Sequence, residues 1–188
     1  TLALAVQCLV VYQLLLFVFT RLNPLRFLKK FSPVMMFAFT TATSNATIPL
    51  SIDTLDKKIG VSKKISSFTI PLGATINMDG TSIMQGVAVI FIAQVYGMEL
   101  TPAQLLTVIA TAMIASIGTA GIPSVGLIML AMVLTSVGLP TEGIALIMGI
   151  DRILDMLRTA VNITGDAVCT TIVSSQNKEL DRSIFNRD

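Results

Sequence analysis

The sequence has no histidine and no tryptophan, and its two cysteines, Cys8 and Cys169, lie in separate apolar stretches. This pattern excludes a disulfide framework, a zinc site and catalysis by histidine. Charge is also scarce, because 13% of the 188 residues are charged, against about a quarter in soluble domains. The net charge of +2 is too small for nucleic-acid binding. With 53% hydrophobic residues and a mean hydropathy of +0.80, the composition indicates a membrane protein.

Four long apolar stretches follow one another, over residues 2–19, 31–50, 67–96 and 105–177, the last interrupted near 138–143. Only the first reads as a simple spanning helix of about 20 residues. The second has a Ser/Thr/Asn-rich centre. The fourth contains a Gly/Pro-rich segment in the middle of the part that precedes its interruption. Because the chain opens inside an apolar run without a basic leader, we expect a fragment of a longer membrane protein.

The basic residues predict the topology. Eleven of the thirteen Lys and Arg residues lie within 21–30, 57–64 and 178–187, whereas the loops 97–104 and 139–143 have none. Keeping all three basic clusters on the cytoplasmic side requires two re-entrant hairpins that enter from opposite sides. The predicted fold is an all-α membrane protein with these parts: a spanning helix at 1–20, an inner hairpin at 31–56, a helix with an Asn-Met-Asp-Gly-Thr break at 67–96, an outer hairpin at 105–138, a helix at 143–177 and a cytoplasmic tail at 178–188.

The order of hairpin and helix therefore occurs twice with opposite orientation. Ala46–Pro49 in the first hairpin resembles Ala120–Pro123 in the second, and polar breaks are predicted at Asn77–Thr81 and Asn162–Asp166. Inverted repeats with interrupted segments indicate a secondary transporter whose binding site lies near the membrane midplane.

Six polar residues of the last helix fall on one stripe about 100° wide on a helical wheel. They are Asp151, Asp155, Arg158, Thr159, Asn162 and Asp166. Charged groups in a membrane are functional by default, although a structural network that pins helices together stays open for them. With Asp79 and Arg152 included, the charges expected inside the membrane are four acids and two bases. The formal −2 favours a bound hard cation such as Na⁺ on oxygen ligands, with protonated carboxylates as the alternative.

Four motifs, at 71–81, 116–123, 129–134 and 155–166, strongly resemble the dicarboxylate/amino acid:cation symporter family, which comprises the glutamate transporters and their prokaryotic relatives. The resemblance covers nearly the whole chain. It implies a transporter rather than an enzyme, with no organic cofactor. It further implies the C-terminal half of the protein, with most of one mobile transport domain. The N-terminal scaffold, through which relatives form homotrimers, would lie outside this sequence.

The resemblance also implies site residues. The substrate contacts carried over are Ser44, Thr81, Ile122, Gly126, Asp155, Arg158, Thr159 and Asn162. The sodium contacts carried over are Gly73, Thr75, Asn77, Asp79, Ser116, Ile117, Thr119, Asn162 and Asp166. Arg158 would hold the side-chain carboxylate of an acidic amino acid, and Asp155 its α-amino group.

Two positions depart from the pattern of relatives. Archaeal members carry an Arg where this chain has Ala42, and we expect Arg152 to supply that positive charge from the last helix, paired with Asp155 or another carboxylate of that face. Proton-coupled eukaryotic members carry a Glu where this chain has Gln85.

The sequence therefore predicts a Na⁺-coupled symporter of aspartate or glutamate that works by alternating access. The expected location is a prokaryotic inner or plasma membrane, with the basic loops and the C-terminus in the cytoplasm. A proton-coupled glutamate or C4-dicarboxylate symporter of the same family remains the nearest alternative. An intramembrane aspartyl protease or a passive channel fits the polar residues less well.

Overall fold

The computed structural model describes residues 1–117 and 125–187, and within them the chain is all α-helical, with one isolated β-bridge between Val61 and Leu180 in place of any strand. The all-α class predicted from the sequence is confirmed. The elements in chain order are α1 (Leu2–Val6), η1 (Gln7–Val11), α2 (Tyr12–Thr20), α3 (Pro24–Thr41), α4 (Ser44–Thr54), η2 (Leu55–Ile59), α5 (Lys63–Ile76), α6 (Asp79–Val95), α7 (Pro102–Ile117), α8 (Val125–Ser136), η3 (Thr141–Ile144), α9 (Ala145–Met148), α10 (Asp151–Gln176) and α11 (Arg182–Asn186).

The first three elements form one continuous helix that contains a π-helical turn, η1. A π turn leaves a carbonyl without its usual α-helical partner, and here the Gln13 side chain donates to the Cys8 carbonyl at 2.9 Å. Residues five apart come onto the same face across such a turn, which brings Gln7 and Tyr12 together.

The first hairpin consists of α3 and α4, which pack against each other. Asn23 caps α3 by accepting from the Arg26 amide at 3.1 Å, and Pro24 occupies the first turn, where its fixed φ suits a helix start. The hairpin therefore begins earlier than the predicted residue 31. The charged residues before that point belong to the helix, because its buried stripe already starts at Phe27 and continues through Phe31.

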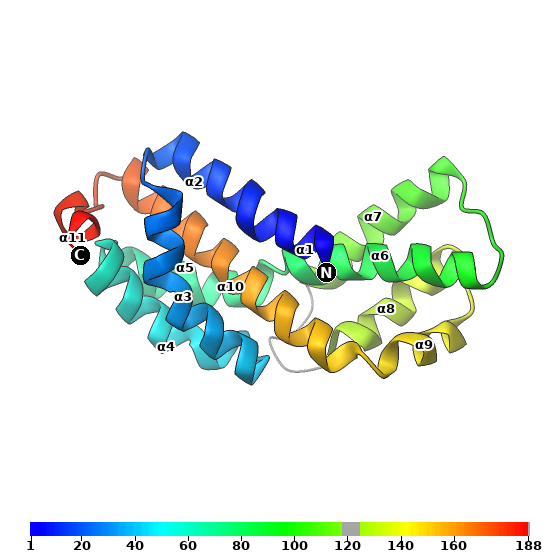
Figure 1. Cartoon of the computed structure of the whole chain (residues 1–188). Helices are drawn as coiled ribbons and strands as arrows, with labels where there is room; N and C mark the ends of the chain where they lie inside the picture. The colour runs from blue at the N-terminus through cyan, green and yellow to red at the C-terminus, as the bar shows by residue number, and fades with distance from the viewer. Residues whose placement is uncertain (118–124, 188) are drawn as a thin grey trace.

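A break at Asn77 and Met78 separates α5 from α6, where the sequence predicted one. Farther along, α7 and α8 form the second hairpin, and its predicted tip lies outside the described residues. In Figure 1 the two hairpins open towards opposite ends of the molecule.

The predicted break at Asn162–Asp166 is wrong, because α10 is one uninterrupted helix from Asp151 to Gln176. A single glycine inside a helix costs only about 1 kcal/mol, and packing compensates for it here, since Gly165 lies against the hydroxyl of Tyr12. The chain breaks instead before α10, at Gly149 and Ile150.

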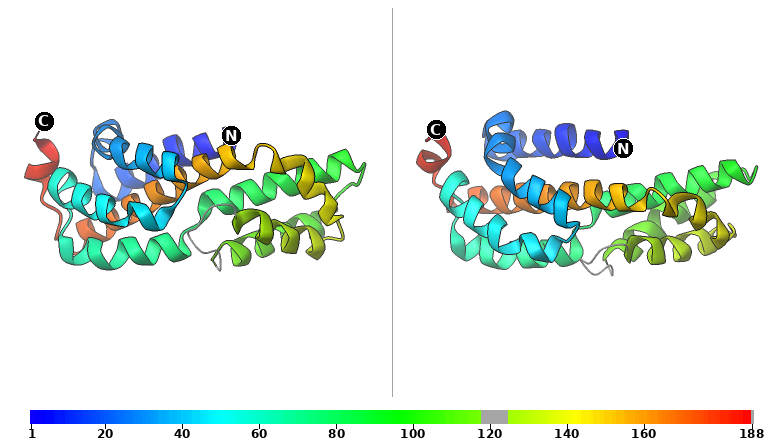
Figure 2. Two further views of the ribbon diagram at one scale, coloured as in Figure 1. Left: turned by 90° about the horizontal axis from the view of Figure 1, so that it is seen from below. Right: turned by 60° about the horizontal axis from the view of Figure 1, so that its bottom comes forward.

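Two hydrophobic cores lie on either side of the middle of α10. One is formed mainly by the first helix, α3, η2, α5 and the second half of α10, and the other by α6, α7, α8 and the turns around α9. The views in Figure 2 show the resulting elongated molecule, with α11 at one end and the loop between α6 and α7 at the other. The polar residues of α10 lie between these cores.

Candidate functional site

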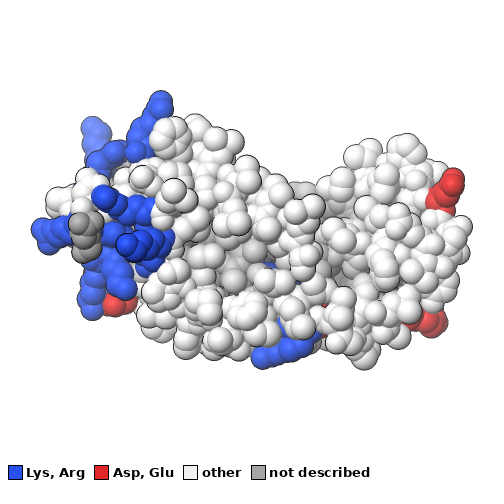
Figure 3. Space-filling view, in the orientation of Figure 1, with Lys and Arg blue, Asp and Glu red and all other residues white. Residues whose placement is uncertain are grey.

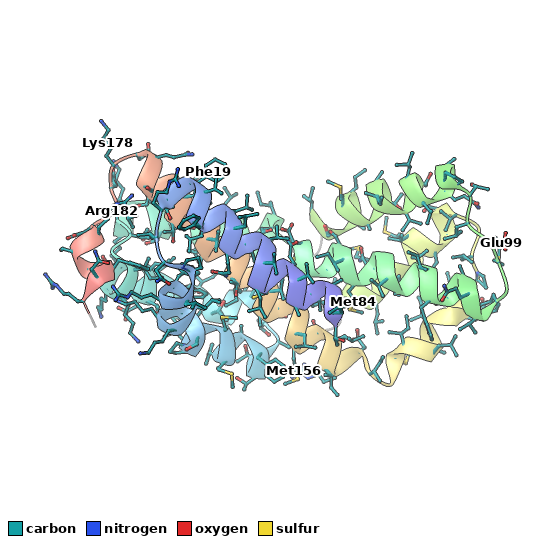
Figure 4. The ribbon with its side chains drawn as sticks, turned by 45° about the horizontal axis from the view of Figure 1, so that its top comes forward. Phe19, Met84, Glu99, Met156, Lys178 and Arg182 are labelled. Carbon is teal, nitrogen blue, oxygen red and sulfur yellow. The ribbon has the colours of Figure 1, made fainter. Side chains whose placement is uncertain are left out.

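The polar stripe predicted on the last helix is buried along its length. The side chains of Asp151, Asp155, Arg158, Thr159, Asn162 and Asp166 are each at most 5% exposed. Figure 4 shows Met84, which contacts Arg158, near the middle of the molecule, with Glu99 at one end and Lys178 and Arg182 at the other. The site therefore lies far from the basic and acidic ends.

Arg158 is the buried cation of the site. Its Nε donates to Asp155 Oδ1 at 2.9 Å, and its Nη1 lies 3.9 Å from Asp151 Oδ1. Nη1 also approaches the Met84 sulfur at 3.3 Å. The guanidinium is packed against Gly126 of α8, where a β-carbon would collide with it. Hairpin α7–α8 thus approaches the group that would recognise a carboxylate.

Asn162 connects α10 to the start of α6. Its Oδ1 accepts from the Gly80 amide at 2.7 Å, and its Nδ2 lies 3.4 Å from Thr81 Oγ1 and 3.3 Å from the Met78 sulfur. The Gly80 amide is among the first of α6 and has no partner within its own helix. The Asn162 side chain therefore caps α6.

Asp166 lies one turn farther along and faces the break between α5 and α6. Its Oδ1 accepts from Asn77 Nδ2 at 2.7 Å, and Asn77 Nδ2 also lies 3.4 Å from the Asn162 carbonyl. The Asp166 carboxylate is so close to Gly73 that a β-carbon there would lie 2.5 Å from Oδ1. The structure thus places three predicted sodium contacts, Gly73, Asn77 and Asn162, around the carboxylate of a fourth, Asp166.

Two contributors from the first helix were not predicted from the sequence. Gln7 Nε2 and Tyr12 Oη donate to Asp79 Oδ2 at 3.3 Å and 3.1 Å. A signal was present, because polar side chains are rare in that apolar helix, but their common face depends on the π turn. Asp79, predicted as a sodium contact, is thus already hydrogen-bonded within the chain.

The remaining predicted residues are less closely grouped. Ser44 is buried at the start of α4, whereas Thr75 is exposed and donates to the Pro71 carbonyl at 3.0 Å. Ser116 accepts from the hydroxyl of Ser82, a residue not predicted, at 2.7 Å, and Ile117 is exposed. Thr119 and Ile122 lie outside the described residues.

The expected role of Arg152 is wrong. Its side chain is exposed, and among the described residues it forms no ion pair with Asp155 or any other carboxylate, whereas Arg158 pairs with Asp155. On this helix Arg152 follows the first residue of the buried stripe and points away from it. Four carboxylates, of Asp79, Asp151, Asp155 and Asp166, then accompany the guanidinium of Arg158, a formal charge of −3 when all are ionised.

Gln85 lies beside this cluster on α6 and is 1% exposed. Its Nε2 is 3.5 Å from the Gly126 carbonyl, and its Oε1 has no hydrogen-bond partner among the described residues. An amide cannot carry a proton at neutral pH, so this position offers an acceptor and no titrating group.

The oxygen atoms present suit an alkali cation better than a transition metal. Within residues 1–117 and 125–187, no three Asp, Glu, His or Cys side chains come together as a metal site. What does converge is the Asp166 carboxylate, the Asn162 backbone carbonyl and the Asn77 side-chain amide, whose nitrogen donates to the carboxylate. Carboxylate and carbonyl oxygens are hard donors, and their total charge here is low. Such a set fits a monovalent cation.

The family model and the curated relatives that match this chain point to the same family. The model of the sodium:dicarboxylate symporter family matches residues 1–176. The chain is 43% identical to an excitatory amino acid transporter of Caenorhabditis elegans over 175 residues, which cover 93% of this chain and 35% of that protein. It is 43% identical to human excitatory amino acid transporter 1 over 185 residues, 98% of this chain and 34% of that protein.

Human excitatory amino acid transporter 2 is 45% identical over 169 residues, 89% of this chain and 29% of that protein. The chain thus spans about a third of the length of the curated relatives it matches. These relatives are animal proteins and lend no support to the expected prokaryotic membrane. The family predicted from the four motifs is confirmed: the chain belongs to the sodium:dicarboxylate symporter family.

Proposed function

We propose that the protein containing this chain is a Na⁺-coupled secondary symporter of acidic amino acids, aspartate or glutamate. The observation that carries the proposal is the buried series along α10, in which a guanidinium, an amide and a carboxylate follow each other at Arg158, Asn162 and Asp166. Each lies four residues, about 6 Å, from the next. A substrate site and a cation site would therefore be adjacent on one rigid helix.

The substrate end of the series suits a zwitterion with an extra carboxylate. The planar guanidinium of Arg158 binds a carboxylate in a bidentate manner. Asp155 accepts from Arg158 in the structure and would turn to the α-ammonium of a bound amino acid. A simple dicarboxylate has no ammonium group for Asp155, which favours amino acids over C4-dicarboxylates.

The cation end would couple to the substrate end through Asn162. Na⁺ bound among Asp166, Asn77 and the Gly73 backbone would fix the α5–α6 break against α10. Helix α6 begins directly after that break, and its Gly80 amide donates a hydrogen bond to the Asn162 side chain. A cation that fixes this geometry raises substrate affinity, and the substrate raises cation affinity by the same factor.

A membrane setting is supported by the surface. The helical segments Leu2–Thr20 and Lys63–Val95, the second of which consists of α5 and α6, are long and apolar enough to span a bilayer by length and composition. Large apolar side chains are exposed along the first helix, among them Leu9 and Leu14 at 58% and 59%. A water-soluble monomer rarely exposes so many. We further propose that the hairpins are re-entrant, that the basic end is cytoplasmic and that the protein assembles as a trimer through segments outside this chain.

The test is uptake of radiolabelled aspartate into proteoliposomes that contain the whole protein. An inward Na⁺ gradient at equal pH is expected to drive accumulation, whereas an inward proton gradient without Na⁺ is not. Uptake that follows the pH gradient and ignores Na⁺ would overturn the proposal in favour of proton coupling. Gln85 speaks against that alternative, because its amide does not titrate.

A further inference from the structure

One end of the molecule carries a basic cleft that the proposed transport cycle does not use. It has a volume of about 620 Å³ and lies between the first turns of α3 and the end of η2. The lining residues are Asn23, Leu25, Arg26, Lys29, Lys30, Pro33 and Lys58. We call this the basic cleft, and Figure 3 shows the Lys and Arg side chains gathered around that end of the molecule.

Four cations line the basic cleft, and no acid lines it among residues 1–117 and 125–187. Among the described residues, Arg26, Lys29 and Lys58 form no ion pair, although Arg26 donates to the Asn186 side chain at 3.2 Å. The nearby acids Asp53 and Asp56 line a separate cleft. Within the described part of the chain, the charges of Arg26, Lys29 and Lys58 are therefore not balanced by the walls of the cleft.

Lys30 holds the shape of the cleft. Its ammonium donates to the backbone carbonyls of Lys58, Ile184 and Arg187 at 3.0, 3.2 and 2.7 Å. These bonds join α3, η2 and the C-terminal segment. The cations are thus presented by elements fixed to one another and not by a mobile loop.

Apolar surface adjoins the charges. Leu25 is 78% exposed in the cleft wall, and Met36 and Phe37 continue as exposed apolar side chains farther along α3. A ligand that combines an anionic head with a hydrocarbon tail matches both surfaces. Basic pockets at the cytoplasmic ends of membrane helices bind phosphorylated lipid headgroups in this way.

We propose that the basic cleft binds the phosphorylated headgroup of an anionic membrane lipid, with Arg26, Lys29 and Lys58 as the phosphate contacts. The proposal rests on the proposed membrane function, because it requires this end to lie at a bilayer surface. The ligand chemistry is a phosphate ester that carries more than one negative charge. An inositol phospholipid with phosphates on its ring is the probe that fits best.

The binding experiment uses the whole protein in detergent and a fluorescent short-chain phosphatidylinositol bisphosphate, followed by anisotropy. The triple variant Arg26→Gln, Lys29→Gln, Lys58→Gln removes three charges from the cleft and keeps Lys30, which has a structural role. Each surface cation contributes roughly a fivefold factor in affinity for anionic lipid. Three such factors multiply to a loss of about a hundredfold, and we expect the measured loss to approach it.

The matched control is Lys63→Gln, Lys64→Gln, Lys178→Gln, which removes three charges from the same end outside the cleft. A local site predicts a much smaller loss in this control. Equal losses in both triple variants would overturn the proposal, since binding would then follow only the net charge. If soluble inositol phosphate or inorganic phosphate bound as tightly as the lipid, a free phosphate ligand would replace the lipid and the proposal would also fail.

A second measurement needs no substitution. A photoactivatable phosphoinositide bound to the wild-type protein should label peptides that contain residues 24–33 or Lys58, and labelling confined to other segments would contradict the proposal. Neither measurement depends on transport. Failure of aspartate uptake with intact lipid binding would therefore count against the proposed function alone, and the reverse result against the cleft alone.

Discussion

The side chain of Asn77 donates to the carboxylate of Asp166 at 2.7 Å, which ties the break between α5 and α6 to the middle of α10. The bond joins an amide at the end of a helix to a carboxylate that is 4% exposed. A buried carboxylate is costly unless it is paired or binds a cation. In the proposed cycle, Na⁺ at this carboxylate would supply the missing positive charge.

The first prediction concerns the close packing of α6 on α10. A β-carbon at Gly80 would lie 2.8 Å from the Arg158 carbonyl oxygen, which is backbone and cannot turn away. We expect Gly80→Ala to destabilise the protein by about 1–3 kcal/mol. Gly86 lies on the same helix, and a β-carbon there would meet no atom within 4 Å, so Gly86→Ala should leave stability unchanged or raise it by up to about 1 kcal/mol. Thermal unfolding in detergent measures both, and equal shifts would contradict this packing.

The second prediction concerns Tyr12. Tyr12→Phe removes one of the two hydrogen bonds to Asp79 and leaves that of Gln7. The loss of one bond to a charged group corresponds to roughly 1.5–3 kcal/mol. We expect about a tenfold weaker dependence of substrate binding on Na⁺, because Asp79, at the start of α6 next to the break, is then held by one hydrogen bond in place of two. Tyr96 is 45% exposed, and Tyr96→Phe is the control that should change nothing.

The third prediction separates the two arginines of α10. Arg158→Lys keeps a counter-charge for Asp151 and Asp155 but loses bidentate geometry. Truncating such a buried charge contact costs about 2–5 kcal/mol, so aspartate affinity should fall roughly thirtyfold or more while the protein still folds. Arg152→Lys, at the exposed position, should leave affinity nearly unchanged. An equal loss of aspartate affinity in both variants would show that Arg152 also belongs to the substrate site.

The fourth prediction concerns pH at the C-terminal segment, outside the spanning helices. Hydrogen bonds from Ser183 hold the pKa of Asp181 below its ordinary value, with the Ser183 amide 2.8 Å from Oδ1. The ionised carboxylate therefore stabilises α11 at all pH values above the ordinary Asp pKa. This contribution is lost as the pH falls through the lowered pKa.

The protection factor for hydrogen exchange at the Phe185 amide, which donates to the Asp181 carbonyl at 3.4 Å, should fall over that acid range. Asp181→Asn keeps a capping oxygen that does not titrate, so exchange in this variant should no longer show the acid step. A step of the same size in wild type and variant would assign the transition to another group.

The parts of the site that depend on a regular helix were predictable from the sequence. The positions from Asp151 to Asp166 share a stripe because α10 keeps 3.6 residues per turn, and all six polar members are buried. The grouping of Asn77 with Asp166 was likewise expected from the family motifs. These features follow from the local helical periodicity and from the four family motifs.

The rest depends on irregular backbone or on neighbours. The meeting of Gln7 and Tyr12 at Asp79 requires a π turn that no composition signal reveals. Helix α10 is continuous through Gly165, and the Tyr12 hydroxyl occupies the space that a side chain there would take, which the sequence does not reveal. The residue type of Arg152 is compatible with a place in the site, and only the exposure of its side chain in the structure shows that it lies outside.

The most direct test of the coupled site is aspartate affinity, measured by calorimetry on the whole protein, with Na⁺ and with choline at the same ionic strength. Coupling of typical strength predicts roughly tenfold or tighter binding in Na⁺ for the wild type. In Asp166→Asn, which keeps the shape and removes the cation's carboxylate, that difference should vanish. Equal affinities in Na⁺ and choline for the wild type would contradict the claim that the cation and the amino acid bind as a coupled pair.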